Sequence, residues 1–133
     1  INHIYYIKVY CGAIKMTKRK HDADHECPVE ITLDVIGGKW KGMVLYWLLN
    51  GTARFNEIRR AVPNATQRML TLQLRELESD GVIRRKVYAE VPPKVEYSLT
   101  EFGLSLKPIL LLMRDWGTQY RTKLKRARST TAT

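Results

Sequence analysis

The segment between residues 54 and 99 constrains the fold of this 133-residue chain most strongly. Its first half contains two successive sets of apolar residues at helical spacing, which predict two short amphipathic helices. The sets are Phe55, Ile58 and Val62, and then Leu70, Leu74 and Leu77. Asp80-Gly81 ends the second helix, and residues 83–90 and 94–99 indicate two strands around a turn at Val91-Pro92-Pro93. Helix, turn, helix and a two-stranded wing are the outline of a winged-helix nucleic-acid-binding domain.

Helices are also expected on both sides of this segment. Pro28 suits the first position of a helix that ends at Gly37-Gly38, which makes Cys27 its cap residue. A second helix is expected over residues 39–50, and Thr100 caps a last long helix that Pro108 should kink or split. The predicted fold is therefore mainly α with a small β-hairpin wing, a winged helix-turn-helix in the element order α-α-α-α-β-β-α.

The last helix carries more apolar surface than a small domain needs. Its apolar residues recur at spacings of four and three, and further leucines lie on other sides. Such a helix is either deeply buried or shared with a second subunit. We expect a homodimer formed by the last helix together with the helix that starts at Pro28. The expected interface residues are Ile31, Phe102, Leu106, Ile109, Leu110, Met113, Trp116 and Tyr120.

The charge of the chain favours a polyanionic partner. Residues 27–133 carry 18 Lys and Arg against 10 Asp and Glu, a net charge of +8. A basic balance suits nucleic acid, although many soluble proteins share it. Two cysteines, Cys11 and Cys27, are too few for a secreted disulfide framework, and no apolar run is long enough to span a membrane. We therefore expect a cytoplasmic protein that contacts no membrane.

The chain divides into an arm, one folded domain and a tail. Residues 1–26 are expected to form an arm, residues 27–120 the winged-helix and dimerisation domain, and residues 121–133 a basic, frayed tail. A basic leader at Met16 is typical of a natural N-terminus. We interpret residues 1–15 as sequence that is not native to the protein, the alternative being an extra strand or arm.

The second helix of the turn motif should enter the major groove of DNA with its first residues. These residues are Thr66, Gln67, Arg68 and Thr71, on the side opposite the leucines. Glutamine can read adenine, arginine can read guanine, and threonine can contact a thymine methyl or a phosphate. The alternative is a polar face that is merely solvated.

Further cations are expected to contact phosphates from helix starts and from the wing. They are Lys39, Lys41, Arg54, Arg85, Lys86 and Lys94. Strand alternation places Arg85 on the face of Ile83, so a half-buried position against Glu96 or Glu76 is an equal alternative for it. For each cation taken singly, an ordinary surface charge remains the simpler interpretation.

Cys27 is the candidate for thiol chemistry. A helix N-terminus favours a thiolate, whereas Asp24, Glu26 and Glu30 oppose it, and a plain small residue at a helix start is the alternative.

Enzyme chemistry is not indicated. The histidines, His3, His21 and His25, all fall in the arm, and no glycine-rich phosphate loop appears. His21 and His25, with Asp24 and Cys27, form only a weak zinc pattern because no second Cys/His cluster accompanies them. We expect no enzyme activity, no cofactor and no metal.

Long segments of the chain resemble the HxlR family of bacterial transcription regulators, relatives of the MarR group. The segments are CPVEITLDVIGGKWKGMVLYWLLNGTARFNEIRR, LTLQLRELESDGVIRRKVYAEVPPKVEYSLTEFG and LKPILLLMRDWG. The resemblance implies a homodimeric winged helix that binds operator DNA, with residues 66–71 on the recognition helix and Lys86 to Lys94 in the wing. It also implies dimerisation through the helix at Pro28 and the last helix. Some members use a cysteine at the Cys27 position as a sensor of oxidants or electrophiles.

Two function classes stay open at the level of the sequence. The first is a regulator that binds double-stranded DNA at an inverted-repeat operator, with thiol modification as a candidate signal. The alternative is a winged-helix protein-interaction module without sequence-specific DNA binding. Loss of Arg and Lys from the recognition helix and wing would favour the second class, and this chain retains them.

Overall fold

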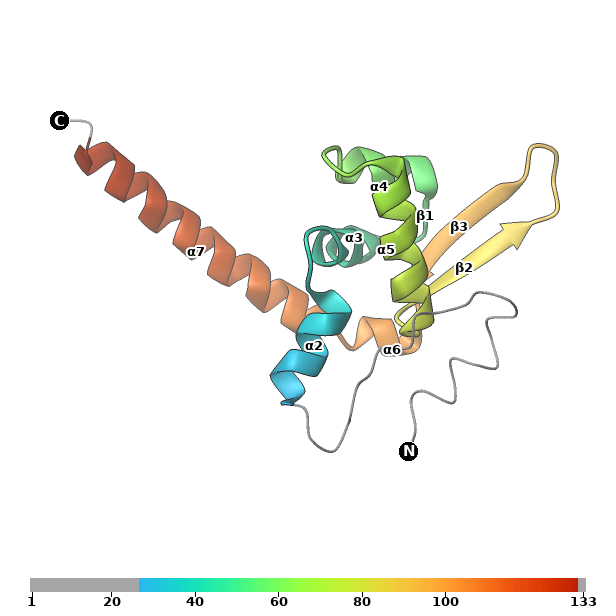
Figure 1. The fold of residues 1–133 in the computed structure, drawn as a ribbon, viewed down its shortest axis with the longest axis horizontal. Coiled ribbons are helices and arrows are strands. Elements are labelled where there is room, and N and C mark those ends of the chain that lie inside the picture. Colours follow the sequence, from blue (N-terminus) through green and yellow to red (C-terminus); the bar gives the residue numbers. More distant parts are fainter. Residues whose placement is uncertain (1–26, 132–133) are drawn as a thin grey trace.

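The computed structural model describes residues 27–131. Figure 1 shows α3, α4 and α5 packed together, the β2–β3 hairpin projecting from one side of this body and α7 from the other. The predicted mainly α fold with a hairpin wing is confirmed. The elements are α2 (Pro28–Ile36), α3 (Lys41–Leu48), β1 (Ala53–Arg54), α4 (Phe55–Ala61), α5 (Gln67–Ser79), β2 (Ile83–Tyr88), β3 (Lys94–Leu99), α6 (Glu101–Leu104) and α7 (Lys107–Thr131).

The helices α4 and α5 pack through the two apolar sets that the sequence predicted. Ile58 and Val62 of this pair are fully buried, as are Leu70, Leu74 and Leu77, each at most 1% exposed. They join the buried residues of α3 in a single core. Burial of each such side chain stabilises the fold by about 1.5–3 kcal/mol, which fixes the orientation of α5 on the body.

The start of α5 is fixed by Thr66, one of two residues, with Asn64, that the sequence offers as its cap. The Thr66 hydroxyl oxygen accepts a hydrogen bond from the backbone N–H of Met69 at 3.1 Å. This satisfies one of the N–H groups that a helix start leaves without a partner. The cap therefore fixes where α5 begins, and with it the position of the polar residues that follow Thr66.

The sheet has three strands in the order β1-β3-β2, and not only the hairpin that the sequence predicted. The additional strand β1 pairs with β3 through Ala53 opposite Tyr97 and Arg54 opposite Glu96. Two residues are too short to show strand alternation, so only their tertiary pairing defines β1. Strand β2 also ends earlier than expected, because the N–H of Glu90 turns back to the carbonyl of Tyr88 at 2.9 Å.

The last predicted helix is split into α6 and α7, as Pro108 led us to expect. Thr100 caps α6, its hydroxyl oxygen accepting from the N–H of Gly103 at 2.9 Å. Pro108 is the second residue of α7, where the missing N–H costs no helical hydrogen bond. A Cβ at Gly103 would collide with the carbonyl of Val82, so glycine allows α6 to pack against the start of β2.

The helix α7 continues through most of the segment that we expected to fray. It runs to Thr131, and every side chain from Leu112 to Thr131 is exposed. The expectation of a frayed tail rested on its polar composition, but its lysines, arginines and alanine are good helix formers. Residues 121–131 are therefore a helical projection from the domain.

Several expectations concern residues 1–26 or 132–133, which lie outside the described residues. They are the arm, the native start at Met16, and the contributions of His21, Asp24 and His25 to a zinc pattern. Within residues 27–131, no group of three His, Cys, Asp or Glu side chains is arranged to hold a metal ion. The same residues include no helix with the length and apolarity needed to cross a membrane.

Candidate nucleic-acid interface

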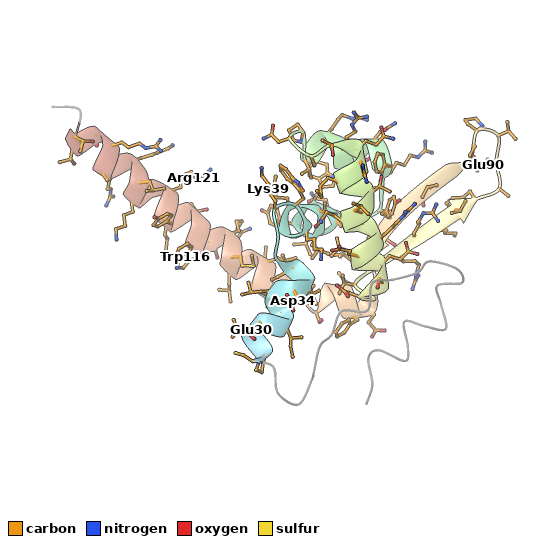
Figure 2. All side chains as sticks on the ribbon, in the orientation of Figure 1. Glu30, Asp34, Lys39, Glu90, Trp116 and Arg121 are labelled. Atoms are coloured by element: carbon orange, nitrogen blue, oxygen red, sulfur yellow. The ribbon has the colours of Figure 1, made fainter. Side chains whose placement is uncertain are left out.

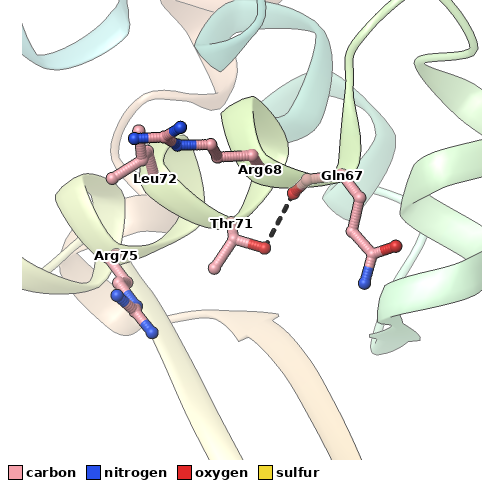
Figure 3. A pocket seen from close by; sticks show the side chains of 5 residues that line it. All are labelled: Gln67, Arg68, Thr71, Leu72 and Arg75. Carbon is pink, nitrogen blue, oxygen red and sulfur yellow. Dashed lines mark hydrogen bonds between the residues drawn. The ribbon is translucent and has the colours of Figure 1, made fainter.

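The exposed face of α5 gathers three of the four residues that the sequence predicted to read DNA, and the fourth, Thr66, is the helix cap. Gln67, Arg68 and Thr71 line a shallow hollow together with Leu72 and Arg75 (Figure 3). The Thr71 hydroxyl donates to the Gln67 carbonyl at 2.8 Å, which fixes the Thr71 side chain on the helix. Arginine, glutamine and a fixed threonine on one face offer donors and acceptors that match base edges.

Two residues of this face were missed by the sequence analysis. Arg75 follows Thr71 by one helical turn and Arg68 by two, so the same spacing could have identified it. Leu72 is 44% exposed, although an apolar residue on this helix looks like core from the sequence alone. An exposed aliphatic side chain between two arginines offers an apolar contact for a thymine methyl.

The wing carries Lys86 and Lys94 on the sheet face that points away from the core. Arg54, Glu96 and Lys86 lie in register across the three strands, and Tyr88 lies opposite Lys94. Lys94 Nζ lies 3.0 Å from Glu96 Oε1, and the Tyr88 hydroxyl donates to Glu96 Oε2 at 3.0 Å. The ammonium nitrogens of Lys86 and Lys94 lie 4.7 and 4.9 Å from the centre of the Tyr88 ring. The Tyr88 ring therefore positions both lysines, and the Glu96 carboxylate also holds Lys94.

The charges around Glu96 also change its acidity. The hydrogen bond from Lys94 is the largest influence, and the one from Tyr88 acts in the same direction, so the pKa of Glu96 is held below its ordinary value. Partial burial opposes this shift without reversing it. Glu96 is thus a stable anion within a group of cations on the wing.

Arg85 does not occupy the half-buried position that was one alternative for it. It is exposed and lies opposite Tyr97, while the preceding inward-facing residue, Ile83, is buried. The carboxylates considered as its partners pair elsewhere, Glu96 with Lys94 and Glu76 with Lys41. The hairpin leaves the body after Ile83, so an inward-facing position beyond that point has no core beneath it.

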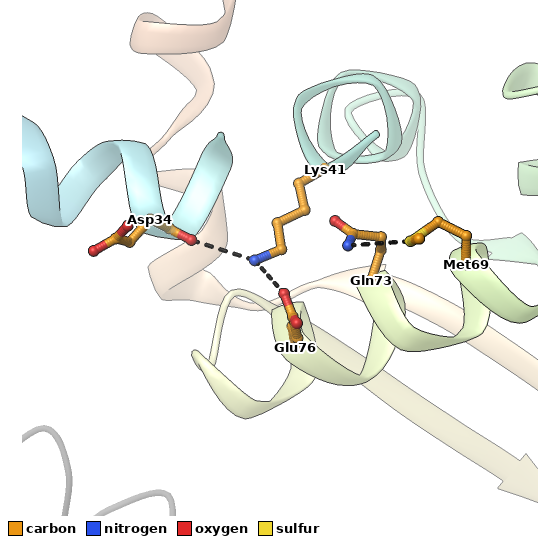
Figure 4. A network of polar contacts seen from close by, with 5 residues as sticks. All are labelled: Asp34, Lys41, Met69, Gln73 and Glu76. Carbon is orange, nitrogen blue, oxygen red and sulfur yellow. Dashed lines mark hydrogen bonds and ion pairs between the residues drawn. The ribbon is translucent and has the colours of Figure 1, made fainter. Parts of the chain in front are cut away.

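Lys41 corrects the expectation of a phosphate contact at the start of α3. Its side chain is 5% exposed, and its Nζ lies 2.5 Å from Glu76 Oε2 of α5. The same ammonium donates to the carbonyl of Asp34 in the last turn of α2 at 3.3 Å (Figure 4). Lys41 is therefore a structural residue that joins α2, α3 and α5.

The other two cations expected at helix starts are exposed. Lys39 lies just before α3, with its ammonium 5.0 Å from the centre of the Trp40 ring. Arg54 precedes α4, where its backbone N–H donates to the Glu57 carboxylate at 3.3 Å. Both side chains remain accessible to a phosphate.

The expected dimer residues separate into buried and exposed groups. Leu110 is 3% exposed and belongs to the core of its own subunit, and Leu106 packs against that core, so these two present little surface to a partner. Ile31 of α2 is half-buried. The exposed group, in which the fractional exposure reaches 66%, is Phe102, Ile109, Met113, Trp116 and Tyr120. The rings of Trp116 and Tyr120 stack with centroids 5.3 Å apart, which extends this apolar surface along α7.

Cys27 is the predicted cap residue of α2 and carries an exposed free thiol. Pro28 follows as the first helical residue, and the Cys27 side chain makes no capping hydrogen bond. The sulfur is therefore accessible to a reagent in solution.

A helix-turn-helix whose second helix has an exposed polar face, followed by a basic hairpin, defines a winged helix-turn-helix protein. The sequence pattern of the HxlR-like helix-turn-helix family matches residues 35–125. The chain belongs to this family, which is a family of transcriptional regulators and not a class of enzymes.

Individual relatives agree with this assignment. The chain is 66% identical over 98 residues to the uncharacterized HTH-type transcriptional regulator YdeP of Bacillus subtilis, covering 74% of this chain and 77% of that protein. It is similar to the redox regulator HypR in its reduced form, with a TM-score of 0.71 and 64% identity over 74% of this chain and 98% of that one. For HypR in its oxidized form the TM-score is 0.67, with 67% identity over 70% of this chain and 96% of that one.

Proposed function

We propose that this protein is a homodimeric transcription regulator that binds an inverted-repeat operator in double-stranded DNA. In this proposal α5 enters the major groove, and the wing contacts the backbone or the minor groove. The observation that carries the proposal is the exposed face of α5, where Gln67, Arg68, Thr71 and Arg75 lie together. The fold does not need this face, because the leucines on the opposite side hold α5 to the body.

The residue types suggest that α5 reads the bases and that the wing contacts phosphates. Arg68, in the first turn of α5, suits a bidentate contact with guanine, and Gln67 beside it suits adenine. Lys86 and Lys94 of the wing suit phosphates, which set position and affinity without reading sequence. Their common contact with the Tyr88 ring supports this role because it holds both ammonium groups on one face.

Dimerisation is supported by apolar side chains that a single chain leaves exposed. Trp116 and Tyr120 on α7 are 66% and 47% exposed, and Val29 and Leu33 on α2 are 64% and 55% exposed. Single exposed apolar residues are ordinary, but a set on two helices indicates an interface. A two-fold axis through it would require half-sites about 10 base pairs, or a multiple, apart.

Modulation by thiol chemistry is the finer part of the proposal. Cys27 carries an exposed thiol and is the cap residue of α2, one of the two helices assigned to the dimer. The similarity to a protein described as a redox regulator, in reduced and oxidized forms, supports the same kind of control here.

Titration of labelled DNA from upstream of its own gene or a neighbouring gene tests the proposal. Arg68→Ala should weaken operator binding by about 1–3 kcal/mol and relax specificity at one position per half-site. Lys94→Ala should weaken binding to all sequences alike and flatten the salt dependence. Lys107→Ala, an exposed cation at the start of α7, is the control. Operator affinities for Arg68→Ala and Lys94→Ala that both equal that of the control would refute this interface.

A further inference from the structure

The end of α7 is a helix of one charge sign. Residues 121–131 carry five cations and no Asp or Glu. All of these cations are exposed, and the family match ends within the segment, at residue 125. They are Arg121, Lys123, Lys125, Arg126 and Arg128.

Four cations of α7 form a basic stripe, defined here as Arg114, Arg121, Lys125 and Arg128. Their separations of seven, four and three residues place them on one side of the helix. Arg114 shows which side this is, because α7 contacts α3 and Arg114 hydrogen bonds there to Tyr46. Arg114 also pairs with the neighbouring Asp115 at 3.0 Å, so among the described residues the unpaired part of the stripe is Arg121, Lys125 and Arg128. The basic stripe therefore lies on the side of α7 that meets the body at α3. In Figure 2, Arg121 lies on the upper side of α7 and Trp116 on the lower side, so the basic stripe is separate from the apolar surface.

The cations of residues 121–131 repel one another. Arg121, Lys125 and Arg128 are one helical turn apart in succession, and like charges at this spacing destabilise a helix. The helix dipole offsets some repulsion at the C-terminus, but its effect is confined to the last turn, which excludes Arg121. With no carboxylate in residues 121–131, an anion outside the helix is the partner that this charge pattern fits.

The segment is also placed to meet the DNA. Figure 1 shows the end of α7, the loop before α5 and the tip of the β2–β3 hairpin along the same edge of the molecule. In the proposed complex this edge faces the duplex, because a recognition helix enters the groove with its N-terminal residues. The 25 residues of α7 span about 37 Å, so its end reaches well beyond the body.

We propose that Arg121, Lys125 and Arg128 bind phosphates of the same operator duplex, outside the groove that α5 reads. This inference rests on the proposed function, to which it adds a backbone contact. The contact involves phosphates only, so it adds affinity and salt dependence without adding base specificity.

The test compares two double variants with the same change of charge. Arg121→Gln/Lys125→Gln removes two cations of the basic stripe, and Lys123→Gln/Arg126→Gln removes two from other sides of the same turns. Glutamine preserves helix propensity, which circular dichroism checks. Operator affinity is measured between about 50 and 200 mM salt. We expect the first variant to lower the slope of log K against log salt by about 3–4 per dimer, since each phosphate contact contributes about 0.9, and the second to keep the wild-type slope.

Ethylation interference on the operator identifies the phosphates. A set of phosphates whose ethylation blocks the wild type, but not Arg121→Gln/Lys125→Gln, is the expected result. Equal slopes and equal interference patterns for the two variants would overturn the proposal. Dissociation of the dimer by the first variant alone would also overturn it, by placing the stripe against the second subunit. Wild-type protein that binds no operator would instead refute the proposed function and this inference together.

Discussion

Lys41 Nζ lies 2.5 Å from Glu76 Oε2, an ion pair that joins the first residue of α3 to α5. The same ammonium donates to the carbonyl of Asp34 in the last turn of α2. One buried cation therefore connects α2, which Cys27 caps, with α5, which carries Arg68. The position of α5 relative to α2 depends on this connection as well as on the apolar core.

The two partners of this ion pair should differ in the cost of their removal. The Lys41 side chain is 5% exposed and that of Glu76 is 46% exposed. Glu76→Ala leaves a buried ammonium without its carboxylate and should lower the free energy of unfolding by about 3 kcal/mol, the lower end of the range for broken buried pairs. Lys41→Met leaves a carboxylate that water can solvate and should cost about 1 kcal/mol.

Urea unfolding of the two single variants and of Lys41→Met/Glu76→Ala measures this difference. The double variant should be close to Lys41→Met, because the buried charge is then gone. A larger loss for Lys41→Met than for Glu76→Ala would contradict this order and show that the ammonium stabilises the fold mainly through its other contact, the Asp34 carbonyl.

Local pattern was sufficient to predict most of the fold. The helical spacing of Ile58 and Val62, and of Leu70, Leu74 and Leu77, identified two helices whose apolar faces are buried. Thr66 was one of two residues considered as the cap of α5, and Pro108 was expected to kink or split the last helix. Each of these features is decided within a few residues of the chain.

What the sequence could not provide depends on residues far apart. Lys41 pairs with Glu76 across 35 positions, and β1 exists only because β3 returns beside it. The one local sign of a structural Lys41 is a cation at the start of a helix, where the dipole disfavours it. The half-buried alternative for Arg85 stayed open for a similar reason, because strand alternation does not show where the sheet extends beyond the core.

The acidity of Glu96 gives a prediction for the wing. Its pKa in the folded protein should lie below the ordinary value of 4.5, because Lys94 and then Tyr88 hydrogen bond to the carboxylate. A lowered folded-state pKa adds stability that is present above the unfolded value and is lost as pH falls through the folded value. Carbon-detected NMR titration should show this pKa rising towards 4.5 in Lys94→Ala and rising less in Tyr88→Phe. A wild-type Glu96 that titrates at or above 4.5 would contradict this arrangement.

Trp116 should be a principal residue of the dimer. Its ring is 66% exposed in one chain and stacks on Tyr120, so a second subunit could bury both. Trp116→Ala should weaken the dimer by about 2 kcal/mol or more, roughly a 30-fold rise in the dissociation constant. Sedimentation at micromolar concentration measures this dissociation constant. Val87→Ala is the control, because Val87 lies in the wing and is 52% exposed. Equal dissociation constants for both variants would place the interface elsewhere.

Cys27 should be the residue through which oxidants change operator binding. Its thiol is exposed, and Cys27 is the cap residue of α2. The last turn of α2 is held to α5 through Lys41. Modification of a thiol beside the proposed dimer interface should alter the spacing of the two α5 helices. A shift of a few ångströms misaligns the second half-site, because the groove repeat is fixed at about 34 Å. Operator titration with diamide should therefore weaken or alter binding by the wild type and by Cys11→Ser, but not by Cys27→Ser. Identical responses of the wild type and Cys27→Ser, or no response in either, would leave Cys27 as a residue that only starts a helix.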